Sequence, residues 1–237
     1  MSNVNLSFDL HIHSCLSPYG GEHMTPKNIA SVCALAGYDV VALTDYNSCG
    51  NSAAFQKAAE AHGLLAIPGM ELCLREDIHV ICLFPDLDRA LAFSDLVRGK
   101  LPQLENNPQI FGDQLLVDEN DTVLGQDSAF LVGAADIGTY EVAALVEQYG
   151  GVVYPAHMNG DSYSLLSTLG LWDSGMGFKL AEVSMDCPDS FCHRADLDEL
   201  RFIKGSNAHT IDAIPDQAQT MDVPERTAQA VINWLKQ

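Results

Sequence analysis

Histidines and one glutamate recur where predicted strands of this chain run out into loops. Imidazole and carboxylate groups are common ligands of zinc, iron and manganese. A barrel-like α/β protein gathers such groups from several strand ends at one rim. The sequence therefore predicts a metal centre built from His11, His13, Glu71, His79, His157 and His209.

His11 and His13 stand two residues apart on a predicted strand, so their side chains share a face. Inside a barrel an unpaired imidazole is costly, although ordinary hydrogen bonds could satisfy each histidine. Glu71 alone could be a solvated loop residue. Because histidines and a glutamate recur at the ends of several strands, metal binding is favoured over these separate explanations. Asp9 could orient a ligand imidazole.

The elements that would position these residues alternate between strand and helix patterns. Seven strand candidates in this rhythm predict an α/β fold with a mostly parallel sheet, either a closed barrel of about seven strands or an open sheet. No nucleotide-binding glycine motif supports the open sheet. The expected strands are 6–12, 39–44, 64–72, 79–84, 151–156, 180–185 and 201–206, and the expected helices are 25–37, 51–62, 87–99, 139–149, 162–169, 188–200 and 224–236.

Residues 101–138 interrupt the alternation. They contain two β-prone runs around an acidic turn, which predicts a hairpin. We interpret the chain as one domain, 1–237, in which this stretch is an insertion that could cover the mouth of the site like a lid.

Composition limits the partners. The formal charge is −20 with only 12 lysines and arginines, which argues against binding duplex nucleic acid. We find no signal peptide and no apolar run long enough to span a membrane, so a soluble cytoplasmic protein is expected. The seven cysteines include no C-x-x-C pair, so no disulfide framework is expected. Protein partners and oligomeric state stay open.

Six segments carry a resemblance to a known family. D-L-H-I-H-S, A-L-T-D-Y-N, I-P-G-M-E, E-D-I-H-V, Y-P-A-H and G-S-N-A-H resemble, in this order, the motifs of the PHP (polymerase and histidinol phosphatase) family. The resemblance covers about residues 6–212. It implies a distorted, TIM-like (β/α)7 barrel with a metal site at the C-terminal ends of the strands, holding up to three zinc, manganese or iron ions.

The resemblance also implies metal-dependent hydrolysis of a phosphoester by a metal-activated hydroxide. The ligands would be the five histidines and Glu71 named above, with Glu71 bridging two ions. We expect a small phosphomonoester or nucleotide as substrate.

Three positions depart from the family pattern. Tyr46 stands where a histidine is usual, Pro18 lies in a segment that lacks the usual aspartate, and Asn207 replaces an aspartate. These changes weaken an ion site, because cations prefer charged or strongly basic donors. Two ions are therefore expected rather than three. His23 or Glu22 could replace the aspartate that is missing from the segment around Pro18, His23 being preferred. Asn207 is kept as a candidate ligand.

Further roles are assigned from position in the sequence. A nearby histidine or Asp45 could help to protonate the leaving group, and Tyr46 could donate to a phosphate oxygen. The cations proposed to hold phosphate are Arg75, Arg194 and Lys204.

Two other functions remain open. A degenerate member could bind metal and ligand as a non-catalytic regulatory module. A barrel hydrolase that acts on C–N bonds is the third interpretation, but the carboxylated-lysine position expected of such a site is missing.

Overall fold

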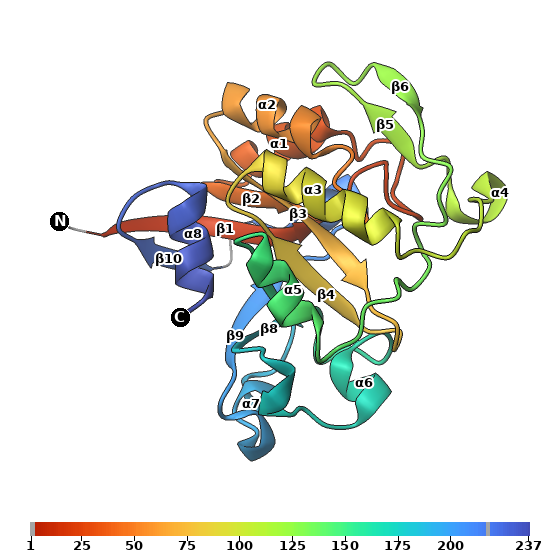
Figure 1. Cartoon of the computed structure of the whole chain (residues 1–237). Coiled ribbons are helices and arrows are strands. Elements are labelled where there is room, and N and C mark those ends of the chain that lie inside the picture. Colours follow the sequence, from red (N-terminus) through yellow and green to blue (C-terminus); the bar gives the residue numbers. More distant parts are fainter. Residues whose placement is uncertain (1–2, 217–218) are drawn as a thin grey trace.

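The computed structural model describes residues 3–216 and 219–237, and its centre is a curled six-stranded sheet with helices packed on it (Figure 1). The strands follow the order β10 (Thr220–Val223), β1 (Val4–Ile12), β2 (Val40–Leu43), β3 (Leu65–Cys73), β4 (His79–Leu83) and β7 (Val152–Pro155). Strands β1, β2 and β3 pair in parallel, whereas β4 runs antiparallel to both β3 and β7.

Two further strands, β8 (Leu180–Ser184) and β9 (Arg201–Gly205), form a parallel pair. Beyond the end of β7, the Met158 amide donates to the carbonyl of Glu182 in β8 over 2.7 Å. Beyond the end of β1, the His13 amide donates to Ala208, which follows β9, over 3.0 Å. The pair thus reaches both β7 and β1, which is consistent with a distorted barrel.

The helices begin at local capping signals. Thr25, Asp86, Ser164 and Thr227 each accept a hydrogen bond from a backbone amide in the first helical turn. The helices are α1 (Pro26–Leu35), α2 (Ser52–Ala61), α3 (Leu87–Arg98), α4 (Pro108–Phe111), α5 (Val142–Gln148), α6 (Leu165–Leu169), α7 (Asp189–Cys192) and α8 (Ala228–Leu235).

Buried apolar strands make the core against which these helices pack. All four residues of β2 are buried, as expected of a continuous apolar run in a sheet covered on both faces. Phe8 on β1 and Tyr154 on β7 belong to the same buried cluster as residues of α8. The rigid sheet fixes where its strand ends lie, and these ends carry the polar residues of interest.

Several expectations need correction. The sheet is mixed rather than mostly parallel, because the chain turns through residues 74–78 straight into β4 without a helix. The (β/α)7 count is therefore not established. Strand β10 was not predicted. The expected helix 188–200 is one helical turn, α7, followed by a 3-10 turn at Ala195–Leu197. The last helix begins at Ala228, where Thr227 caps it, rather than at 224.

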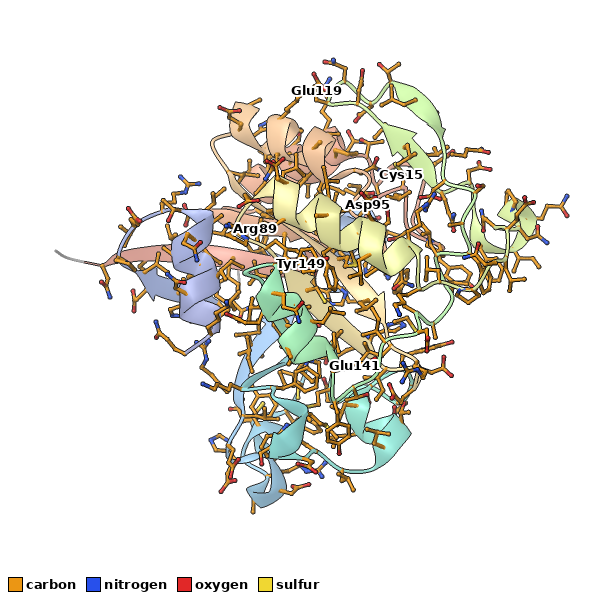
Figure 2. The ribbon with its side chains drawn as sticks, viewed as in Figure 1. Cys15, Arg89, Asp95, Glu119, Glu141 and Tyr149 are labelled. Atoms are coloured by element: carbon orange, nitrogen blue, oxygen red, sulfur yellow. The ribbon has the colours of Figure 1, made fainter. Side chains whose placement is uncertain are left out.

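Residues 101–138 contain the predicted hairpin, formed by β5 (Leu115–Val117) and β6 (Val123–Gln126). Asn51 at the start of α2 holds it: its amide donates to Leu115 O, and its Oδ1 accepts from Val117 N. Figure 2 shows Glu119 at the tip of the hairpin, on the side of α2, where it pairs with Lys57 over 3.3 Å. The hairpin therefore packs on α2.

Among the residues that the model describes, no helix combines the length and the apolar character needed to cross a membrane.

Candidate metal centre

Glu71 on β3 is the centre of a cluster of imidazoles at one edge of the sheet. Its side chain is fully buried. His11 comes from the end of β1, and His157 follows β7. His79 opens β4, and because β4 is antiparallel, its N-terminal end lies beside the C-terminal ends of β3 and β7. The expectation that every ligand comes from the C-terminal end of a strand is thus wrong for His79.

One carboxylate oxygen of Glu71 faces the two histidines of the first motif. Its Oε2 lies 3.0 Å from His11 Nε2 and 2.9 Å from His13 Nε2. The two imidazole nitrogens are 3.1 Å apart. Three donor atoms of metal-ligand type therefore meet at one point.

The other carboxylate oxygen faces a second pair of histidines. Glu71 Oε1 lies 2.8 Å from His79 Nδ1 and 3.1 Å from His157 Nε2. The buried His79 Nδ1 has no partner in hydrogen-bond geometry despite this short distance. Glu71 is thus shared by two separate donor groups, one with His11 and His13 and one with His79 and His157.

Charges in the cluster shift the pKa values of its members. Burial disfavours the ionised form of Glu71, but the imidazoles of His11 and His79 outweigh burial and hold the pKa of this carboxyl well below its usual range. Burial likewise disfavours a charged His11, yet the carboxylates of Glu182 and Glu71 raise the pKa of this imidazole well above its usual value. Burial lowers the pKa of His13.

Glu182 on β8 contacts two of the histidines at atoms other than those that face Glu71. Its Oε1 lies 2.8 Å from His11 Nδ1 and accepts the backbone amide of His157 over 3.2 Å. A hydrogen bond at Nδ1 leaves the His11 Nε2 lone pair for the cluster. Gly205 on β9 makes room for this carboxylate, because a Cβ at that position would overlap it.

Asp45 does not face the cluster directly. It is buried and accepts hydrogen bonds from the Ser14 amide, the Ser14 hydroxyl and the Ser17 hydroxyl, at 2.6, 2.7 and 2.8 Å. Ser17 Oγ in turn lies 2.8 Å from His13 Nδ1. Through these hydrogen bonds Asp45 orients His13 by way of Ser17, and its role as a proton donor to the leaving group stays a prediction.

Tyr46 and His209 lie against the cluster. The His209 ring stacks on His13, with centroids 4.0 Å apart and planes inclined by 12°. The Tyr46 ring lies 4.6 Å from His13 and 5.2 Å from His79. Burial, and next the nearby His13, lower the pKa of His209 to about 3, so this imidazole is neutral at neutral pH. Its buried Nδ1 and the Oδ1 of Asn207 both lack partners among the described residues.

Other predicted site residues lie elsewhere. The side chain of His23 is 83% exposed, on the turn before α1, and its nearest charged contact is Glu22 at 3.8 Å. Arg75 points to Asp136 and Glu141, and Figure 2 shows Glu141 at the end of α5 where that helix begins. Arg194 forms an ion pair with Asp196, and Lys204 donates to Met185 O.

A cavity of about 260 Å³ adjoins the cluster. Among the described residues its lining includes no lysine or arginine and no residue of 101–138, so neither the expected phosphate-binding cations nor the expected lid is found there. The lining residues are Tyr46, His79, His157, Gly160, Asp161, Ser162, Tyr163 and Asn207.

Glu182, Ser17 and Tyr163 were not among the predicted site residues. A signal existed for Glu182, since a lone carboxylate in the apolar run L-A-E-V-S-M must be buried with a partner. Ser17 and Tyr163 sit in irregular segments, and their approach to His13 and His79 depends on loop conformation.

The donor set fits divalent metal ions. Imidazole nitrogens and carboxylate oxygens converge within 4.8 Å in each of the two groups. The orphaned atoms His79 Nδ1 and His209 Nδ1 would gain a partner. Zinc, iron and manganese all accept such ligands.

Comparisons with known proteins complete the description. No family model matches the sequence, and no curated protein matches it. Endonuclease Q from Pyrococcus furiosus, a lesion-specific endonuclease, is similar in structure, with a TM-score of 0.70 at 16% identity over 98% of this chain and 56% of that chain. The present chain therefore spans little more than half of the endonuclease.

Two further solved structures are similar along most of their lengths. A protein assigned as a metal-dependent phosphoesterase from Bifidobacterium adolescentis has a TM-score of 0.62 at 18% identity, over 96% of this chain and 95% of its own. An amidohydrolase from Chromobacterium violaceum, solved with sulfate, has a TM-score of 0.60 at 20% identity, over 92% of both chains.

These similarities confirm the PHP-type fold that the sequence motifs implied. They also correct one expectation. A structure of endonuclease Q holds a 27-mer duplex with an abasic lesion at the active site, and it matches 98% of this chain with a TM-score of 0.70. A protein with this fold thus binds duplex DNA, and the acidic composition of the present chain does not exclude that class of partner.

Proposed function

We propose that this protein is a metal-dependent phosphoesterase. The observation that carries the proposal is the position of Glu71, whose two carboxylate oxygens each face two histidines. His11 and His13 would hold one divalent ion, His79 and His157 a second, and Glu71 both. Such ions, when bound, lower the pKa of a water molecule and neutralise charge on phosphoryl oxygens.

The protein's own groups prepare this site for a phosphoester. Glu182 and Ser17 fix the orientation of His11 and His13 through their Nδ1 atoms, so the opposite nitrogens face inward. The Tyr46 hydroxyl stays protonated because burial raises its pKa, so it can donate a hydrogen bond to a phosphate oxygen. Asn207 lines the adjoining cavity, and His209 stacks on His13.

One observation favours a second function. Tyr46 places a phenol beside His13, His79 and His209, where family members usually have a histidine. A phenol is a poor ligand at neutral pH when its pKa is raised, so a site without a third ion is the consequence. The protein could then bind metal and ligand as a regulatory module without turnover.

One experiment separates the two functions. The purified protein is analysed for bound metal and assayed with Mn²⁺ or Zn²⁺ against phosphomonoesters, phosphodiesters, nucleotides and a duplex with an abasic site. A phosphoesterase releases phosphate or cleaves the diester, and His13→Ala loses this activity. Bound metal without turnover of any member of the panel would support the binding module.

The matched control is His193→Ala. His193 is exposed on the turn after α7 and contacts the carbonyl of Asp189, outside the cluster. It should keep both metal content and activity. Loss of activity in His193→Ala to the same extent as in His13→Ala would contradict the assignment of the site.

A further inference from the structure

We propose that Tyr163 is a stacking surface that selects phosphoesters carrying an uncharged planar ring on the alcohol side. This inference rests on the proposed function, because it places the phosphoryl group at the Glu71 cluster and the remainder of the substrate in the adjoining cavity. Both Tyr46 and Tyr163 line that cavity.

Tyr163 is held in place, yet half of its side chain is open. One ring face stacks on His79, with centroids 4.6 Å apart and planes inclined by 21°. Its carbonyl accepts the His79 amide over 2.8 Å, and its backbone adopts a left-handed conformation with φ of 52°. The residue remains 47% exposed. An exposed tyrosine fixed in an unfavourable backbone conformation is a candidate for function rather than for packing.

The charges around the cavity define what can stack there. Among the described lining residues Asp161 carries the one fixed charge, and no lysine or arginine balances it. A second phosphate or a carboxylate on the substrate would therefore be repelled. A neutral ring on Tyr163 would gain an aromatic contact without burying an unpaired charge.

The test compares two substrates with the same linker, one with a planar aromatic ring and one with a non-planar saturated ring. 2-Phenylethyl phosphate and 2-cyclohexylethyl phosphate have similar leaving groups, and the cyclohexyl compound is the more hydrophobic. We expect kcat/KM to favour the phenyl compound by about two- to tenfold, the range of an aromatic pair. Tyr163→Leu should abolish this preference, and Tyr163→Phe should retain it.

The control variant is Tyr140→Leu. Tyr140 is 60% exposed and its hydroxyl lies near Asp173, away from the cavity lining. It should keep the wild-type preference. Equal kcat/KM for the two substrates in the wild type, or an unchanged preference in Tyr163→Leu, would overturn the role of Tyr163 while leaving the phosphoesterase proposal intact.

A binding measurement decides the case if neither ester is hydrolysed. The Mn²⁺-loaded protein is titrated calorimetrically with 3-phenylpropylphosphonate and with 3-cyclohexylpropylphosphonate. Tighter binding of the phenyl compound that is lost in Tyr163→Leu supports the stacking surface on a non-catalytic protein. Equal affinities, or no binding of either compound, reject it.

Discussion

The Nδ1 atom of His11 lies 2.8 Å from Oε1 of Glu182, and both side chains are buried. The same carboxylate oxygen accepts the backbone amide of His157. His11 and His157 face opposite oxygens of Glu71. Glu182 therefore bonds to one histidine of each donor group without belonging to either group.

Removal of this carboxylate should weaken both groups. We expect Glu182→Ala to lower metal affinity about 10- to 100-fold, the usual effect of losing a partner behind a ligand histidine. Glu182→Gln, which keeps one acceptor oxygen, should lose less. Competition with a chromophoric chelator measures the affinity. Glu199→Ala, at an exposed position before β9, is the control, and an affinity in Glu182→Ala equal to that of this control would contradict the prediction.

Shared ligation by Glu71 predicts a distinct pattern of metal loss. His13→Ala should remove one ion and His79→Ala the other, because each contributes to a separate donor group. Glu71→Gln should remove both, because an amide oxygen is a weak and neutral ligand for each group. Metal content by plasma mass spectrometry checks this. A Glu71→Gln protein that retains both ions would show that the carboxylate does not bridge.

The sequence predicted the cluster well because strand periodicity carries the information. His11 and His13 share a face by alternation, and Glu71 and His157 lie at the ends of apolar runs. Neighbouring strands of a curled sheet end close together, so the polar residues at those strand ends meet in space. His79 joined them for a different reason, the antiparallel course of β4, which depends on a short turn rather than on the strand pattern.

The failures share a physical cause. His23, Arg75, Arg194 and Lys204 were assigned from charge or ligand chemistry in loops and strand ends, and side-chain directions there depend on tertiary contacts. Arg75 is four residues from Glu71, yet two acidic residues near α5 hold its guanidinium. The hairpin of 101–138 was predicted from its turn, but its docking on α2 depends on Asn51, which no periodicity indicates.

Metal binding should release protons at neutral pH. In the metal-free protein the carboxylates of Glu182 and Glu71 outweigh burial and raise the pKa of His11, which favours the protonated imidazole. An ion can bind only the neutral imidazole, so it displaces the proton. Calorimetric titration with Zn²⁺ in buffers of different ionisation enthalpy measures the release. Glu182→Gln should reduce it, and a binding enthalpy independent of the buffer would contradict this prediction.

Asp9 should make stability depend on pH. Burial raises the pKa of its carboxyl from 3.8 to about 6, although hydrogen bonds from Ser206 and His11 oppose the shift. The folded state thus binds this proton more tightly than the unfolded state does. The resulting stabilisation is complete below pH 3.8 and is lost as pH rises through 6.

Asp9→Asn removes this dependence. Between pH 4 and pH 8 the unfolding free energy of the metal-free wild type should therefore fall relative to that of the variant, so that the variant gains about 1–3 kcal/mol over the wild type. Urea unfolding at the two values checks it. Asp39→Asn is not a suitable control, because Asp39 accepts hydrogen bonds from Ser7. Asp198→Asn, exposed after the 3-10 turn, should show no such gain. An equal gain in both variants would show that Asp9 is not the titrating group.

The positions of Tyr46 and Asn207 predict how a third ion could be gained. The Tyr46 ring lies 5.7 Å from His209, whose buried Nδ1 has no partner among the described residues, and the Asn207 Oδ1 is orphaned as well. Tyr46→His combined with Asn207→Asp would add an imidazole and a carboxylate to His209. We expect the metal content of this double variant to rise by one ion, and its turnover of the preferred phosphoester to rise with it. Tyr46→Phe with Asn207→Asp is the matched control, since it lacks the new imidazole. If the double variant binds no more metal than this control, then Tyr46 does not occupy an ion position, and the departure of residue 46 from the family pattern has another cause.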